Sequence, residues 1–123
     1  PHQGEIVYPY GPPPTGTDVL WRCEARAYSY VLDYESESYG STYPVLEMHW
    51  YQVAKWTRTG ARLVGGKLVY LDRRVTERQW ASRTPAEALT SFRERRKRQI
   101  GILRSQLQRA ERELELTEGV PLQ

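Results

Sequence analysis

Residues 84–121, TPAEALTSFRERRKRQIGILRSQLQRAERELELTEGVP, decide the fold of this chain because they predict one long helix. Thr84 is a candidate N-cap, and Pro85 stands at the first helical position, where a missing N–H has no cost. Glu87 completes the S/T-x-x-E capping box. A glycine and a proline near the end of the stretch supply the stop signal. We therefore expect a helix over residues 84–118.

The predicted helix is too long for the rest of the chain to cover. At a rise of 1.5 Å per residue, about 34 helical residues span about 50 Å. A compact globule formed by a chain of 123 residues has a radius of gyration of about 14 Å, and therefore a diameter of about 35 Å. We therefore expect the helix to extend beyond its own domain.

The second half of the predicted helix carries apolar residues at alternating steps of three and four. This apolar stripe consists of Ile100, Leu103, Leu107, Ala110 and Leu114. The spacing is typical of the a and d positions of a two-heptad coiled coil. We expect the apolar stripe to pair with a second copy or with a partner helix, supported by the globular part because two heptads are marginally stable alone. The favoured state is a homo-oligomer, most simply a dimer. The alternative is that the stripe belongs to one intramolecular core face.

The residues before the helix predict a small antiparallel sheet. Residues 19–31 alternate between small apolar and polar or aromatic side chains, which is the period of a β-strand. Residues 45–57 are rich in tryptophan, tyrosine and valine, and glycine-containing turns lead into short strands at 61–64 and 67–71. The predicted fold class is α+β: a curved antiparallel β-meander of about four strands followed by one long C-terminal helix. A further short strand at 79–81 is a weaker prediction.

The chain is expected to be organised around a single core, as its length suggests. Residues 1–17 form a Pro-rich extended arm, since their prolines prevent a regular ladder of hydrogen bonds. Residues 18–83 form the antiparallel sheet. Residues 84–118 form the long helix, which packs on the sheet and extends into an oligomer or partner seam, and residues 119–123 form a tail.

The inventory of reactive side chains does not favour catalysis. The chain has one cysteine and two histidines, and none of them stands in metal-ligand spacing. The sequence contains neither a G-x-S-x-G nucleophile motif nor a phosphate-binding G-x-x-x-x-G-K-[ST] motif. We expect a protein that is not an enzyme, with no cofactor, metal or membrane segment, in a reducing cytoplasm.

Basic side chains are concentrated around the start of the predicted helix. Residues 73–98 contain nine basic side chains and three acidic ones. The candidates for binding a polyanion or an acidic partner are Arg93, Arg95, Lys97, Arg98, Arg109 and Arg112. The arginine fork suits phosphates and carboxylates equally. The side chains that we expect to face away from the apolar stripe are Arg95, Arg98, Arg109 and Arg112. DNA or RNA is therefore a candidate partner, and the simpler alternative is a solvated helix surface.

A second candidate surface, the aromatic and acidic end, lies in and beside the first long strand. It consists of Tyr28, Tyr30, Tyr34, Glu35, Glu37, Tyr39 and Tyr43. Tyrosine is enriched at protein interfaces. The neighbouring carboxylates would repel a nucleic-acid backbone, so a protein partner suits this end better.

Residues 78–89, RQWASRTPAEAL, together with the apolar and basic positions that follow as far as Glu111, resemble the C-terminal half of small uncharacterised proteins encoded by tailed phages and prophages. A hairpin over residues 51–60 is also similar, so the resemblance covers residues 51–111. It implies a phage-type accessory protein that acts in the cytoplasm of the bacterial host, and it carries over no catalytic or binding residues.

The expected function is therefore that of a non-enzymatic accessory protein. Its expected partner is a host protein or complex, which it would inhibit or modulate by stoichiometric binding, as anti-CRISPR or anti-restriction proteins do. The first alternative is a nucleic-acid-binding accessory factor that uses the arginines. The second is a structural or oligomerisation component.

Overall fold

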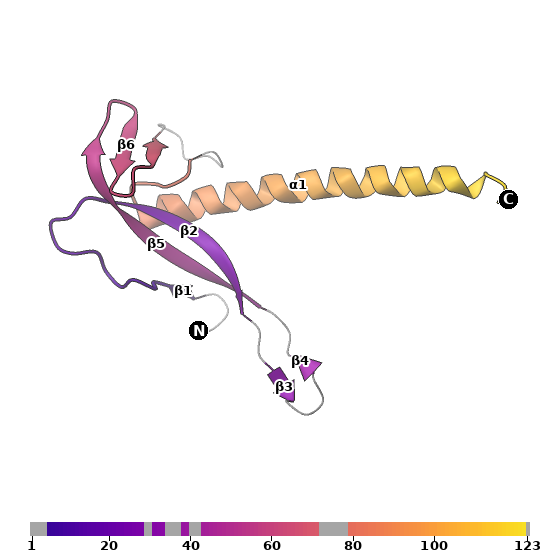
Figure 1. The fold of residues 1–123 in the computed structure, drawn as a ribbon, viewed down its shortest axis with the longest axis horizontal. Helices are drawn as coiled ribbons and strands as arrows, with labels where there is room; N and C mark the ends of the chain where they lie inside the picture. Colours follow the sequence, from indigo (N-terminus) through magenta and orange to yellow (C-terminus); the bar gives the residue numbers. More distant parts are fainter. Residues whose placement is uncertain (1–4, 29–30, 34–37, 40–42, 72–78, 123) are drawn as a thin grey trace.

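The structure is a computed structural model that describes residues 5–28, 31–33, 38–39, 43–71 and 79–122. The main sheet consists of β1 (Ile6–Val7), β2 (Val19–Tyr28), β5 (Tyr43–Trp56), β6 (Gly60–Leu63) and β7 (Leu68–Tyr70). A separate pair consists of β3 (Val31–Asp33) and β4 (Ser38–Tyr39). The only helix among the described residues is α1 (Pro85–Glu118), which follows all the strands (Figure 1).

The strand β5 organises the sheet because all but one of the other main strands pair with it directly. β2 pairs with it antiparallel over its whole length, and β6 pairs with its final residues before turning into β7. β1 pairs with β5 in parallel, with Ile6 opposite Leu46. The α+β class and the meander followed by a C-terminal helix are confirmed, but β1 makes the sheet mixed rather than antiparallel. The predicted strand over 19–31 ends at Tyr28.

Two clusters of buried side chains form on opposite faces of the sheet. Cys23 on β2 and Met48 on β5 are paired in register and pack against the start of α1. Leu20 faces the other way along β2 because side chains alternate. It belongs to a second cluster with Ala61, Leu63, Val69 and Ala81. The predicted strand at 79–81 is instead an isolated bridge between Trp21 and Ser82, whose two backbone hydrogen bonds measure 2.7 Å.

The helix α1 begins at the predicted position. The Thr84 hydroxyl accepts a hydrogen bond from the Glu87 amide at 3.1 Å, and the Glu87 carboxylate accepts one from the Arg83 amide at 3.3 Å. Its 34 residues correspond to about 50 Å, and Gly119 caps its end. Among the described residues, no helix combines the length and the apolar character needed to cross a membrane.

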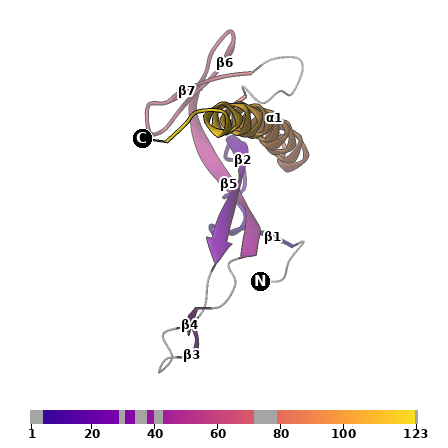
Figure 2. The same ribbon diagram turned by 90° about the vertical axis from the view of Figure 1, so that its right-hand side faces the viewer.

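Only about the first three turns of α1 are anchored to the sheet. Its buried residues are Ala88, Ser91 and Phe92. The start of α1 lies against β2 (Figure 2). Every residue described from Arg96 to Leu122 is exposed. The rest of α1 therefore projects away from the sheet without a covering element in the described part of the chain (Figure 1).

Candidate interaction surfaces on and beside the helix

The start of α1 is fixed to the sheet by small side chains and one ring. Ala88 and Ser91 allow the helix to approach β2 closely, and Phe92, 8% exposed, packs beside Cys23 and Met48. The Ser91 hydroxyl donates a hydrogen bond of 3.0 Å to the carbonyl of Gln79. These contacts place the helix axis but use only one short segment of it.

Arg95 belongs to this anchored segment, so the prediction that it faces outward with the other basic residues is wrong. It follows Ser91 by four residues and Phe92 by three, which places it on the face turned toward the sheet. Its guanidinium donates a hydrogen bond of 2.7 Å to the carbonyl of Cys23. Burial lowers the pKa of Arg95, and the nearby charges of Arg22 and Arg96 lower it further. Arg95 is therefore a structural cation of the helix–sheet contact.

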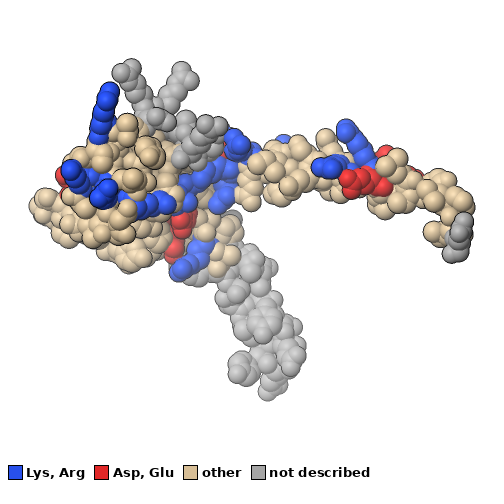
Figure 3. Space-filling model, turned by 45° about the horizontal axis from the view of Figure 1, so that its top comes forward, with Lys and Arg blue, Asp and Glu red and all other residues tan. Residues whose placement is uncertain are grey.

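The remaining basic candidates are exposed, but they do not form one continuous face. They are Arg93, Lys97, Arg98, Arg109 and Arg112. Lys97 lies 3.2 Å from a Glu94 carboxylate oxygen, and Arg109 lies 3.2 Å from that of Glu113. Figure 3 shows basic side chains gathered where α1 leaves the sheet, and a mixed group of basic and acidic side chains further along it.

One basic residue that the sequence interpretation left out of the binding set lies at the base of the projection. The Arg96 guanidinium stacks over the Phe92 ring, 4.9 Å from its centroid. Arg95 approaches the same ring at 5.7 Å while it donates a hydrogen bond to the sheet. A cation over an aromatic face is a favourable arrangement, and the ring stabilises both positions.

The apolar stripe is exposed along its whole length. Its large side chains are exposed by 47% at Ile100, 53% at Leu103, 60% at Leu107 and 66% at Leu114. Ala110, the remaining member, is exposed as well. The prediction of an intramolecular core face therefore does not hold for this half of the helix, since nothing in the described part of the chain covers it.

The apolar stripe is rotated from the face of α1 that packs on the sheet. With 3.6 residues per turn, the stripe lies about a quarter turn from the centre of the buried face around Ser91 and Phe92. A partner lying along the apolar stripe would therefore run beside the sheet rather than into it. Two further apolar side chains, Ile102 and Leu116, are exposed by 47% and 75% and lie off the stripe.

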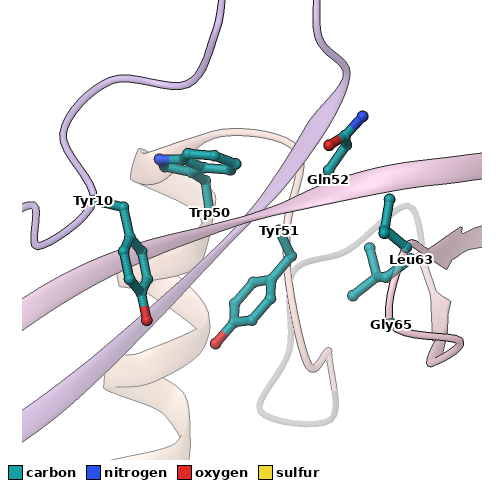
Figure 4. Close-up of a pocket in the computed structure, with 7 residues that line it drawn as sticks. Tyr10, Trp50, Tyr51, Gln52, Leu63 and Gly65 are labelled. Carbon is teal, nitrogen blue, oxygen red and sulfur yellow. The ribbon is translucent and has the colours of Figure 1, made fainter.

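An aromatic groove between the segment after β1 and the strands β5 and β6 was not predicted from the sequence. The segment after β1 places Tyr10 next to Trp50, with ring centroids 6.3 Å apart, and the Trp50 indole donates to the carbonyl of Gly11 at 3.1 Å. The lining residues are Tyr10, Trp50, Tyr51, Gln52, Leu63, Val64 and Gly65, around a volume of about 350 Å³. Tyr10 and Tyr51 point the same way in Figure 4, whereas Gln52 points to the opposite side of β5.

The aromatic and acidic end lies largely outside the described residues. Tyr30, Tyr34, Glu35 and Glu37 are not described. The other three members, Tyr28, Tyr39 and Tyr43, are described only as strand positions of β2, β4 and β5. Tyr28 and Tyr43 are paired in register at the end of the β2–β5 ladder. A binding role for this surface stays a prediction.

Ionisable groups on the sheet are engaged with one another. The Arg22 guanidinium donates to Glu24 and to the Trp80 carbonyl, each at 2.6 Å. The hydrogen bond from Arg22 holds the pKa of Glu24 below its ordinary value. Lys67 lies over the Trp80 ring at 4.5 Å from its centroid, on which Arg22 also stacks. These cations stabilise the packing of Trp80 on the sheet.

Three potentially reactive groups lie on the adjacent strands β2 and β5: a thiol, an imidazole and a carboxylate. The Cys23 thiol is fully buried, and burial raises its pKa. His49 lies 3.1 Å from the buried Glu47 carboxylate. No group of three or more histidine, cysteine or carboxylate side chains with metal-binding geometry occurs within the described ranges.

Comparison with protein-family models, with curated proteins and with solved structures finds no match to this chain.

Proposed function

We propose that this chain is a non-enzymatic accessory protein of the phage type that acts by binding a host macromolecule stoichiometrically. The observation that supports this function best is the projecting half of α1 with its uncovered apolar stripe. Contiguous apolar surface with a polar rim is typical of sites that contact other polypeptides. The target class we propose is a host defence enzyme or complex in the bacterial cytoplasm, inhibited in the manner of anti-CRISPR or anti-restriction proteins.

A protein target is favoured over a nucleic acid by the charges on α1. Glu94 lies within ion-pair distance of Lys97, and Glu113 lies within ion-pair distance of Arg109. Each carboxylate reduces the positive electrostatic potential around its basic partner. Arg95 is turned to the sheet. The arginines that remain exposed alternate with carboxylates toward the end of the helix, which is unfavourable for following a phosphate backbone.

The test is affinity capture from a bacterial lysate treated with nuclease, followed by reconstitution with the purified partner. We expect one host protein at a fixed molar ratio, with its activity reduced in proportion to the complex formed. Leu103→Asp, in the apolar stripe, is expected to weaken the complex, whereas Ile102→Asp, one position earlier and off the stripe, is the matched control. Failure to obtain any complex of fixed ratio with a purified host protein would refute the proposal.

Nucleic-acid binding is the second candidate because Arg93, Arg98 and Arg112 are exposed. A mobility-shift titration with DNA and with RNA at two salt concentrations distinguishes it. If about five phosphates were contacted, the log–log salt slope would be about −4 to −5. Absence of binding at low salt would remove this candidate and leave protein binding or a purely structural, oligomer-forming role.

A further inference from the structure

We infer that the apolar stripe of α1 binds the same stripe of a second copy of this chain, with the two helices antiparallel. The inference rests on the proposed function only in treating the stripe as a polypeptide-binding surface. It goes further by naming a second copy as the occupant of the stripe, so that the host macromolecule binds the dimer, and by giving the direction and register of the two helices.

The charges along the projecting helix are complementary to themselves when the helix is reversed. Residues 93–98 at its base contain five basic side chains and Glu94 as the one carboxylate. Residues 111–118 at its far end contain four glutamates and a single basic side chain, that of Arg112. An antiparallel pair places the acidic residues 111–118 of each copy beside the basic residues 93–98 of the other copy. A parallel pair would place like charges together at both ends.

The heptad positions beside the apolar stripe make this complementarity specific. With Ile100 at an a position, the e positions are Lys97, Arg104, Glu111 and Glu118, each seven residues from the next. In an antiparallel pair, e positions face e positions. Arg104 then lies opposite Glu111 of the second copy and Lys97 lies opposite Glu118 of the second copy, and the two-fold axis repeats both contacts. Within the described part of the chain, Arg104 and Glu111 have no ion pair of their own.

The parallel arrangement lacks these contacts. In a parallel pair, e positions face g positions of the other helix. Arg104 would lie opposite Gln99 and Glu111 opposite Gln106, so neither would find an opposite charge. Glu118 would lie opposite Glu113, which is repulsive. The charges around the stripe therefore select the antiparallel direction.

The acidic end of α1 is unfavourable for the helix alone, which indicates that its charges serve a partner. Carboxylates near a helix C-terminus oppose the helix dipole, and basic residues there would favour it. The last turn of α1 contains no basic residue, and Glu115 and Glu118 lie close to its end. Residues 93–98 of a second copy supply the positive charge that the C-terminal end of α1 lacks.

The length of the projection also fits an antiparallel pair. Pairing Leu107 with Ala110 of the second copy matches a large side chain with a small one, and the same register pairs Leu103 with Leu114. Arg96, where the fully exposed stretch begins, is then level with position 121 of the second copy, just beyond the end of its helix at Glu118. The whole projection is used, and its tip reaches the base of the other helix without entering the sheet.

The first experiment measures dimer affinity by sedimentation in a charge-exchange cycle. Arg104→Glu alone and Glu111→Arg alone should each weaken the dimer about tenfold or more, because each creates two repulsive contacts. The double variant exchanges the charges and should recover affinity close to that of the wild type. A double variant no better than expected from the two single variants would overturn the antiparallel assignment.

The second experiment measures direction by distance. A spin label at Thr90→Cys reports on an exposed position at the base of α1, and the buried Cys23 leaves the added thiol as the reactive one. In the antiparallel register the two labels are about 37 residue positions apart along the axis, or about 55 Å at 1.5 Å per residue. A parallel pair would bring the bases side by side and give a much shorter distance, which would overturn the inference.

The two proposals fail in distinguishable ways. A wild-type protein that is monomeric by itself at all concentrations, but forms a complex of fixed ratio with a host protein, refutes self-association and supports host binding. A dimer with the long label separation that captures no host protein supports self-association and refutes the proposed inhibitory role.

Discussion

Replacing Phe92 by alanine tests whether the first turns of α1 alone anchor the helix. Phe92 is 8% exposed and packs with Cys23 and Met48, so nearly the whole ring is removed from a packed site. Such a truncation costs about 3–5 kcal/mol, a large part of the 5–15 kcal/mol that stabilises a typical domain. For a chain of this size, about 1 kcal/mol corresponds to about 4 °C, so the Tm should fall by about 12–20 °C.

The assay for Phe92→Ala is thermal unfolding followed by circular dichroism and tryptophan fluorescence at one fixed protein concentration, since association also raises Tm. The matched control is Ile102→Ala, which truncates a side chain that is 47% exposed and lies off the apolar stripe. We expect the control to change stability by no more than about 0.5 kcal/mol. A fall in Tm of less than about 4 °C for Phe92→Ala would refute the anchoring role.

Three further predictions concern the sheet. Gly60→Ala should destabilise the fold in urea unfolding, because a Cβ at this position would lie 1.8 Å from the Val69 carbonyl oxygen; unchanged stability would contradict this geometry. Glu24→Gln should be less stable than the wild type at neutral pH. Arg22 lowers the pKa of Glu24 in the folded state, so the extra stability of the wild type is present above the unfolded pKa of about 4.3 and is lost as pH falls through the folded pKa. A wild type that stays more stable than Glu24→Gln well below the folded pKa would contradict the assignment. Cys23, which is fully buried and has a raised pKa, should react with a thiol reagent only when the protein is unfolded; rapid labelling of the native protein would show that the helix opens from the sheet.

The ends of α1 could be predicted because their signals are local. Thr84 and Glu87 form a capping box within one turn, and Gly119 stands directly after the last helical residue. The excess length follows from the same local signals and a size estimate. The turns before β6 and β7 were also predictable from glycines, one of which, Gly66, has a φ of 95°.

Features that depend on distant contacts were missed. β1 is only two residues long, so it has no period to detect, and its pairing with β5 depends on tertiary structure. The arginines were oriented relative to the apolar stripe, whereas the buried face of α1 is made of Ala88, Ser91 and Phe92. Alanine and serine give little hydrophobic signal, and Arg95 was therefore placed on the wrong side.

The aromatic groove was not predicted from the sequence for a similar reason. Tyr10 belongs to a Pro-rich segment without a regular pattern, and only the fold brings it beside Trp50 and Tyr51. The apolar stripe, in contrast, could be identified in full because all five members are on one helix and follow a fixed spacing. Its exposure required the structure, since the sequence interpretation left open an intramolecular role.

The central claim is that the apolar stripe of α1 is buried against a second copy. Leu107 is 60% exposed, and burying a leucine fully contributes about 1.5–3 kcal/mol. Burying the exposed part in both copies therefore contributes about 2–4 kcal/mol. An aspartate at this position should weaken the dimer by a factor of about 30 to 1,000.

Sedimentation equilibrium over the micromolar to millimolar range tests this claim most directly. The wild type is expected to reach twice the chain mass of 14.4 kDa. Leu107→Asp should remain at the mass of one chain over the range in which the wild type is dimeric, whereas Leu116→Asp, a change of the same kind off the stripe, should dimerise like the wild type. A wild-type protein that stays monomeric throughout, or a dimer that Leu107→Asp does not weaken, would contradict the claim.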